Sequence, residues 1–237
     1  AKKHGIKPIL GCEVYVAPDS RHEKTSKDNL RDASYHLILL SENETGYKNL
    51  LQLITKGYLE GFYYKPRIDK ELLAEYAEGL IALSSCVRGE VAHNVNRENV
   101  PRATKVAAQY VQIMGPDNFF LELQNHGLEN QDRINKEIIG IGKKLDIPIV
   151  ATNNCHYLNK EDFRAHEILL CLQTGKTISD PYRMQYPAPE FYFKSPEEMT
   201  ELFREIPEAI TNTLKIAERC ELELEFDKLN LPDYPVP

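Results

Sequence analysis

The sequence has no tryptophan, only three methionines and none at its start, which predicts that the chain begins inside a longer protein. The first residues lack the apolar stretch of a signal peptide, and no apolar run approaches the length of a bilayer-spanning helix. The five cysteines are odd in number, widely spaced and without a CxxC pair. This usage argues against a disulfide framework and favours a reducing, cytoplasmic setting without a membrane.

The sequence also has no excess of positive charge. The chain has 29 basic and 36 acidic residues, and from Glu190 onward the acidic side chains outnumber the basic ones by 12 to 5. The acidity therefore belongs to the C-terminal part, and no broad basic stripe predicts binding to nucleic-acid phosphates. The motifs GxGxxG, GxxxxGK[ST], GxSxG and HExxH are absent as well, which removes the signals of several nucleotide-binding and hydrolytic classes.

What is present is an ordinary globular composition, with 42% hydrophobic and 27% charged residues over 237 positions. Short β-rich runs alternate with helical patterns, which predicts an α/β fold with parallel βαβ units. The expected strands are 8–16, 35–40, 79–84, 119–124 and 148–152. The expected helices are 47–58, 100–114, 134–145, 163–172, one that starts at 196, and 207 to about 220.

Capping residues and prolines predict where two helices begin, and the charge distribution predicts how the chain divides into parts. Ser41 and Glu44 predict a capping box for the first helix, and Pro196 directly after Ser195 predicts another helix start. We expect a main domain over 1–189, acidic helices of the same domain over 190–230, and a proline-rich linker over 231–237.

Two polar residues follow the last predicted strand. Asn154 and His156 are two positions apart, so on an extended backbone they point to one face, and parallel barrels place their active sites at such carboxyl ends. Histidine is the commonest metal ligand, and asparagine is a weak oxygen ligand. On spacing alone, a polar strand end that hydrogen-bonds a loop is the slightly favoured explanation of the pair.

Three further residues belong to the same hypothesis. Glu13 lies among apolar residues of a strand, where a carboxylate must be paired or bound to metal. His36 opens a strand and Cys86 follows one, although each is also typical of a packed core position. Together, ligands of these types suit zinc or manganese and the metal-assisted hydrolysis of a phosphoester.

Four more residues are candidates for lining such a site. Glu122 and His126 bracket another strand end. His166 lies in a helical run, where packing is the simpler reading. Arg67 ends the aromatic and basic segment Phe62-Tyr-Tyr-Lys-Pro-Arg, which could contact phosphate or form a solvated edge.

Ordered motifs along the chain resemble one family. They are Gly5-Ile-Lys-Pro-Ile-Leu-Gly-Cys-Glu-Val-Tyr-Val, Tyr35-His-Leu-Ile-Leu-Leu, Leu83-Ser-Ser-Cys-Val-Arg-Gly-Glu, Phe120-Leu-Glu-Leu-Gln-Asn-His-Gly, Ala151-Thr-Asn-Asn-Cys-His-Tyr and Arg164-Ala-His-Glu-Ile-Leu-Leu. The chain resembles the polymerase and histidinol phosphatase (PHP) domain of bacterial DNA polymerase III α subunits. The resemblance implies a distorted, TIM-like βα barrel whose strand ends hold up to three metals. Some members keep a metal-dependent 3′–5′ exonuclease there, and others retain the domain as a scaffold.

The resemblance assigns Glu13, His36, Cys86 and His156 as metal-ligand positions, and puts Asn154 where the family commonly has aspartate. The family's first motif, His-x-His, and the Thr-Asp-His-Gly-type segment after it are not in this sequence. We therefore expect a barrel that lacks about two βα units, at about 30 residues each. Weak metal binding, little hydrolase activity and self-association through open sheet edges are the expected consequences.

The resemblance implies a role in DNA replication. Polymerisation would occur in a magnesium-dependent palm outside this chain, with DNA and other replicase subunits as partners. Two alternatives remain, namely a stand-alone phosphoesterase similar to histidinol phosphatase and an interaction module that has lost its chemistry.

Overall fold

A computed structural model describes residues 1–24 and 34–226, so the predicted linker at 231–237 lies outside the described residues. The predicted α/β fold is confirmed. Six strands form one sheet in the order β3-β1-β2-β4-β5-β6. Their bounds are Gly11–Val16 (β1), Tyr35–Ser41 (β2), Arg67–Ile68 (β3), Leu80–Leu83 (β4), Phe119–Leu123 (β5) and Ile149–Ala151 (β6).

Strand direction departs from the wholly parallel arrangement at one place. Strand β2 is antiparallel to both of its neighbours, β1 and β4, whereas the pairs β1–β3, β4–β5 and β5–β6 are parallel. An antiparallel neighbour needs no crossover helix, and the described residues between β1 and β2 contain none. The sheet does not close into a barrel among the described residues, and its outer strands β3 and β6 have only two and three residues.

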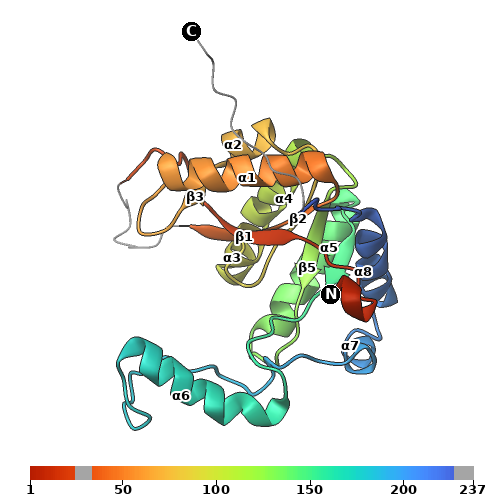
Figure 1. The fold of residues 1–237 in the computed structure, drawn as a ribbon. Coiled ribbons are helices and arrows are strands. Elements are labelled where there is room, and N and C mark those ends of the chain that lie inside the picture. The colour runs from red at the N-terminus through yellow and green to blue at the C-terminus, as the bar shows by residue number, and fades with distance from the viewer. Residues whose placement is uncertain (25–33, 227–237) are drawn as a thin grey trace.

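Helices cover one face of this sheet (Figure 1). They are Glu44–Leu59 (α1), Lys70–Glu75 (α2), Glu90–Asn96 (α3), Val100–Met114 (α4) and Gln131–Leu145 (α5). Leu53 of α1, Tyr110 of α4 and Ile138 of α5 are almost completely buried against strand residues such as Leu39 and Leu121. This continuous apolar layer is the main core.

The other face of the sheet has a smaller apolar layer. Ile81, Leu83, Phe120 and Val150 pack there with Ile216 of α8, which spans Pro207–Arg219. Because side chains alternate between the two faces of a strand, Glu13, His36 and Glu122 share this second face. The fold thus directs three of the predicted site residues to the same side of the sheet.

Two local predictions have different outcomes. The first helix is capped by Asn43, whose Oδ1 accepts a hydrogen bond from the Gly46 N–H at 3.1 Å. The predicted cap, Ser41, is wrong because this residue is still in β2. The predicted helix start at Pro196 is confirmed for α7 (Pro196–Leu202), where the side chains of Ser195 and Glu198 also accept hydrogen bonds from each other's backbone N–H groups.

Helix α6 (Phe163–Thr174) projects away from the sheet and forms, with the segment after it, an arm (Figure 1). We call residues 158–189 the arm. In the part of the chain that the structure describes, no helix has the length and apolarity needed to cross a membrane.

Candidate functional site

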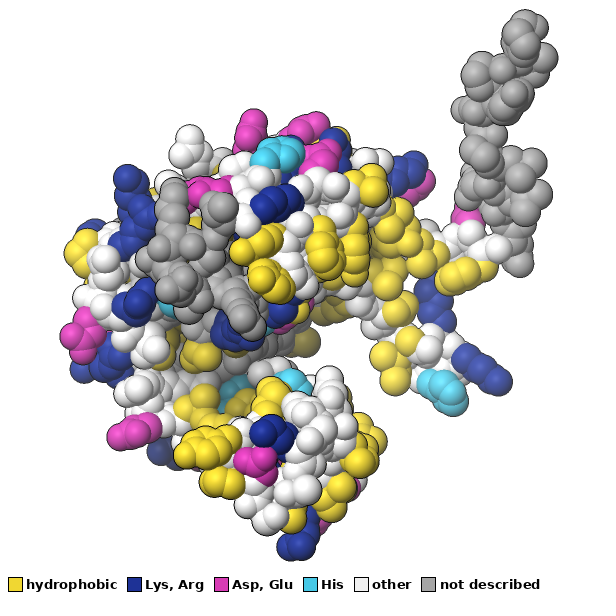
Figure 2. All heavy atoms as spheres, turned by 90° about the vertical axis from the view of Figure 1, so that its left-hand side faces the viewer, with side chains coloured by type: hydrophobic (Ala, Val, Ile, Leu, Met, Phe, Trp, Pro, Cys, Tyr) yellow, Lys and Arg dark blue, Asp and Glu magenta, His cyan; other side chains and the backbone are white. Residues whose placement is uncertain are grey.

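A pocket of about 600 Å³ collects the predicted metal-ligand positions. It is lined by Glu13, His36, Cys86, Asn154 and His156, and Glu122 and His126 line it too. The pocket lies at the carboxyl ends of β4, β5 and β6. His36 joins them from the beginning of its strand because β2 runs in the opposite direction. Figure 2 shows histidine side chains in the hollow between the body of the molecule and the projecting part below it.

Glu13, His36 and Cys86 form the first group in the pocket. Nδ1 of His36 lies 3.1 Å from Oε1 of Glu13. Burial opposes a charged imidazole, but the contacts with Cys86 and Glu13 outweigh it and raise the pKa of His36 to about 9. The contact with His36 in turn lowers the pKa of Glu13, with help from the charges of Arg88 and Lys65.

The Cys86 thiol belongs to the same electrostatic unit. Its burial disfavours the thiolate, yet the hydrogen bond with His36 and a backbone hydrogen bond from Arg88 bring the pKa of Cys86 below its ordinary value. Both ring nitrogens of His36 are buried, and among residues 1–24 and 34–226 their contacts with Glu13 and Cys86 fall short of good hydrogen-bond geometry.

His156 belongs to a second group, which combines the loop after β6 with the arm. Strand β6 ends at Ala151, so Asn154 and His156 lie on a loop, and the argument from strand periodicity does not apply to them. Both His156 ring nitrogens lie 3.0–3.1 Å from the Tyr186 hydroxyl, and the ring is 5.8 Å from that of His166. Burial lowers the pKa of His156, and the charge of His166 lowers it further.

His126 supports this loop rather than offering a free ligand. Its Nε2 accepts a hydrogen bond from the backbone N–H of Asn154 at 3.1 Å, and its backbone N–H donates to Gln131 Oε1 at 2.6 Å. Its ring stacks on Phe191 with centroids 4.5 Å apart and planes tilted by 3°. Burial, together with the charge of Lys194, lowers the pKa of His126 to about 4, so the ring is neutral at pH 7.

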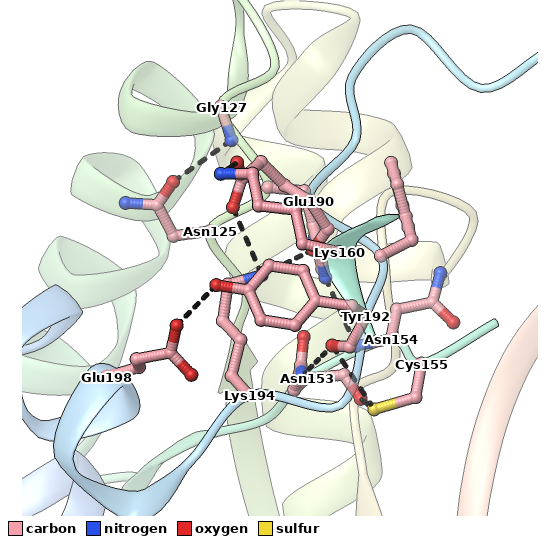
Figure 3. Close-up of polar contacts among 12 residues, drawn as sticks. Asn125, Gly127, Asn153, Asn154, Cys155, Lys160, Glu190, Tyr192, Lys194 and Glu198 are labelled. Carbon is pink, nitrogen blue, oxygen red and sulfur yellow. Dashed lines mark hydrogen bonds and ion pairs between the residues drawn. The ribbon is translucent and has the colours of Figure 1, made fainter. Parts of the chain in front are cut away.

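Residues 190–194, which we call the clamp segment, hold the loop from the other side (Figure 3). The carbonyl of Phe191 accepts from the His156 N–H at 2.7 Å, and that of Tyr192 accepts from Asn153 Nδ2 at 2.7 Å. The buried Lys194 ammonium donates to the Glu190 carbonyl and lies 4.2 Å from the Tyr192 ring centroid.

An ion pair and a tyrosine hydrogen bond connect the clamp segment to the residues on either side of it in the sequence. Lys160 lies 2.5 Å from Glu190, and the Tyr192 hydroxyl donates to Glu198 at 2.5 Å. The contact with Glu198 raises the pKa of Tyr192 to about 12. The position of His156 thus depends on residues about 35 positions further along the chain.

Glu122 is a buried carboxyl group at the base of the pocket. One oxygen accepts hydrogen bonds from the Thr152 hydroxyl and, at 2.9 Å, from Gln124 Nε2. The other oxygen, Oε2, is buried and has no hydrogen-bond partner in the part of the chain that the structure describes. Burial raises the pKa of Glu122, which favours the neutral acid more than is usual for a glutamate.

The remaining two candidates do not line the pocket. His166 packs its ring against Tyr157 and Tyr186, with both centroid distances at 5.2 Å. Arg67 is 4% exposed and holds a neighbouring loop through the carbonyls of Gly61 and Glu23. Tyr186, Phe191 and Arg88 line the pocket without having been predicted. Arg88 lies in the motif that begins at Leu83 but was not singled out there, and no motif or periodicity marks Tyr186 or Phe191.

The donor types fit a metal, but their arrangement does not make a complete site. Imidazole, thiolate and carboxylate are zinc ligands, and His36 and Glu122 carry unsatisfied polar atoms. However, among the described residues no three His, Cys, Asp or Glu side chains are close enough together to hold a metal ion. These residues alone therefore support no metal-dependent step.

Comparisons with known proteins agree on one family. The family described as "PHP domain" matches residues 1–126. DNA polymerase III subunit α of Treponema pallidum is 46% identical over 98% of this chain and 20% of that protein. The same subunit of Borreliella burgdorferi is 46% identical over 100% of the chain, and that of Thermus aquaticus is 43% identical over 98%. The chain spans about a fifth of the length of these relatives.

Proposed function

Because this chain belongs to the PHP domain family, we propose that it is the PHP region of a DNA polymerase III α subunit and serves DNA replication through that larger protein. The observation that carries the proposal is the 46% identity over nearly the whole chain to one part of an α subunit. Polymerisation, with magnesium, DNA and further replicase subunits, belongs to the rest of such a protein.

The size of the native polypeptide tests this proposal. An antibody raised against the chain should recognise a polypeptide about five times as long, since the chain corresponds to 20% of its relatives. A native polypeptide of 27.2 kDa, the mass of this chain alone, that hydrolyses small phosphate monoesters would favour the stand-alone phosphoesterase instead.

For the pocket, we propose a divalent-cation site of low affinity. Glu13, His36, Cys86 and His156 would supply donors, although no three of them converge among the described residues, and zinc or manganese is the ion that suits these donor types. The 3.1 Å contact between Glu13 and His36, and the place of both residues in the lining of one pocket with Cys86 and His156, support this proposal. When bound, the metal would supply Lewis-acid chemistry towards a phosphoester, such as the 3′ end of DNA.

The protein's own residues position these donors. The clamp segment and His126 fix the His156 loop, and the fold of β2 brings His36 beside Glu13. Since no three donors converge, we propose a scaffold role for the described residues in the absence of further ligands. Metal analysis of the purified chain tests this directly. Substoichiometric zinc and manganese after dialysis are expected, and one tightly bound ion per chain would overturn the proposal.

A further inference from the structure

The last turn of α1 and the loop between α1 and β3 expose aromatic rings to solvent. Tyr58, Phe62 and Tyr64 are 57%, 52% and 61% exposed, all within seven residues. Large aromatic side chains usually contribute to a core or an interface, and neighbouring exposed ones mark binding surfaces. Figure 2 looks onto this side of the molecule, where hydrophobic and basic side chains lie together at the surface.

The loop is held in one shape by buried contacts. Arg67 donates to the Gly61 carbonyl at 3.2 Å, and the Tyr63 N–H donates to the Lys65 carbonyl at 3.0 Å. A Cβ atom at Gly61 would lie only 1.7 Å from the Arg67 carbonyl oxygen, so this position excludes a side chain. Tyr64 has φ of 58°, which is a strained conformation for a residue with a bulky side chain. The loop that carries Phe62 and Tyr64 is therefore held in a defined conformation.

Lys65 connects the loop to the pocket. Its Nζ lies 4.4 Å from the ring centroid of Tyr15, and the Tyr15 ring lies 5.1 Å from that of His36. Arg88 lines the same pocket. Lys65 thus stands between the exposed rings and His36, and Arg88 adds a second positive charge at the pocket, although the chain as a whole is acidic.

We propose that the exposed rings of Tyr58, Phe62 and Tyr64, with Lys65 and Arg88, bind single-stranded DNA and direct its end to the pocket. We call these five residues the aromatic platform. Unpaired bases stack on aromatic faces while cations neutralise the phosphates, and both contacts tolerate any sequence. In a duplex the base faces are stacked on each other, so duplex DNA would bind only through the attraction between its phosphates and the two cations. The inference rests on the proposed polymerase origin, which makes DNA the ligand.

Binding of a labelled oligo-dT to the 237-residue chain tests the platform. Fluorescence anisotropy with an oligonucleotide of about 12 nucleotides at about 50 mM salt should give a dissociation constant in the micromolar range. Tyr64→Ala and Phe62→Ala should each weaken binding about five-fold or more, whereas Tyr64→Phe should bind like the parent. Leu214→Ala, which removes an exposed apolar side chain on α8, is the matched control and should have no effect.

The charge contribution is tested separately. Lys65→Met should weaken binding and flatten its salt dependence, Lys65→Arg should restore both, and Lys48→Met on α1 should change neither. An abasic oligonucleotide should bind about five-fold or more weakly than oligo-dT. Equal binding of the two oligonucleotides, no binding by the parent chain, or unchanged binding by the alanine variants would overturn the proposal. The length and polymerase activity of the native polypeptide are measured independently, so failure here is distinct from failure of the proposed function.

Discussion

The backbone N–H of Asn154 donates a hydrogen bond to Nε2 of His126 over 3.1 Å. A residue that the sequence singles out as a candidate ligand is thus held, through its backbone, by a histidine from the end of another strand. This contact makes His126 a positioning residue for the His156 loop, and its neutral state is part of the arrangement.

The neutral state of His126 predicts a pH dependence of stability. Burial lowers the pKa of His126 to about 4 in the folded chain, from an ordinary value of 6.5. The unfolded chain therefore takes up the proton first, so this contribution to stability is complete above about pH 6.5 and is lost as the pH falls towards 4. Urea unfolding at several pH values should show the loss in the parent and not in His126→Phe. The same decline in both proteins would contradict the assignment.

The clamp segment offers a matched pair of substitutions. Phe191 is 5% exposed and stacks on His126, whereas Phe193, two positions later, is 69% exposed. Phe191→Ala should lower the free energy of unfolding by about 3–5 kcal/mol, and Phe193→Ala should change it by less than about 0.5 kcal/mol. Chemical denaturation measures both values. Equal effects would show that the segment does not pack as described.

A glycine pair tests the packing of α1 on the sheet. A Cβ atom at Gly46 would meet the Gly79 carbonyl oxygen at 1.7 Å, while one at Gly140 in α5 would have open space around it. Gly46→Ala should therefore destabilise the fold strongly, and Gly140→Ala should stabilise it by about 0.5–1 kcal/mol. Thermal unfolding distinguishes the two, and a stabilising Gly46→Ala would refute the close approach.

Asn154 gives the sharpest test of the pocket. If its side chain occupies a ligand position, Asn154→Asp supplies a harder and charged donor, and manganese should bind about ten-fold more tightly or better. Asn125→Asp is the control, because Asn125 accepts from the Gly127 N–H but does not line the pocket. Calorimetric titration measures both affinities. Unchanged manganese affinity in Asn154→Asp would remove this residue from the site.

Much of the fold could be predicted because it depends on local patterns. Five strands and the long helices follow from hydrophobic periodicity, which reports burial directly. Strand β3 has only two residues and α2 only six, too few to set a period. The direction of β2 depends on how its loop returns to the sheet, and composition carries no signal for that. Ser41 and Asn43 are both good capping residues, and only the end of β2 decides between them.

The site was predictable only in part, for a related reason. Glu13, His36, Cys86, Asn154 and His156 follow from residue type, strand ends and the family resemblance, and the structure brings them to one pocket. Their roles as ligands stay a prediction. Tyr186 and the clamp segment belong to a stretch without periodicity, and their contacts join residues about 30 or more positions apart. Such contacts arise from tertiary packing alone.

Nucleotide incorporation by the native polypeptide tests the central claim most directly. The polypeptide purified with an antibody against this chain should extend a primed DNA template when deoxynucleotides and magnesium are supplied. Primer extension that follows the polypeptide through purification is the predicted result. A purified polypeptide that contains this chain, is folded and extends no primer would contradict the account.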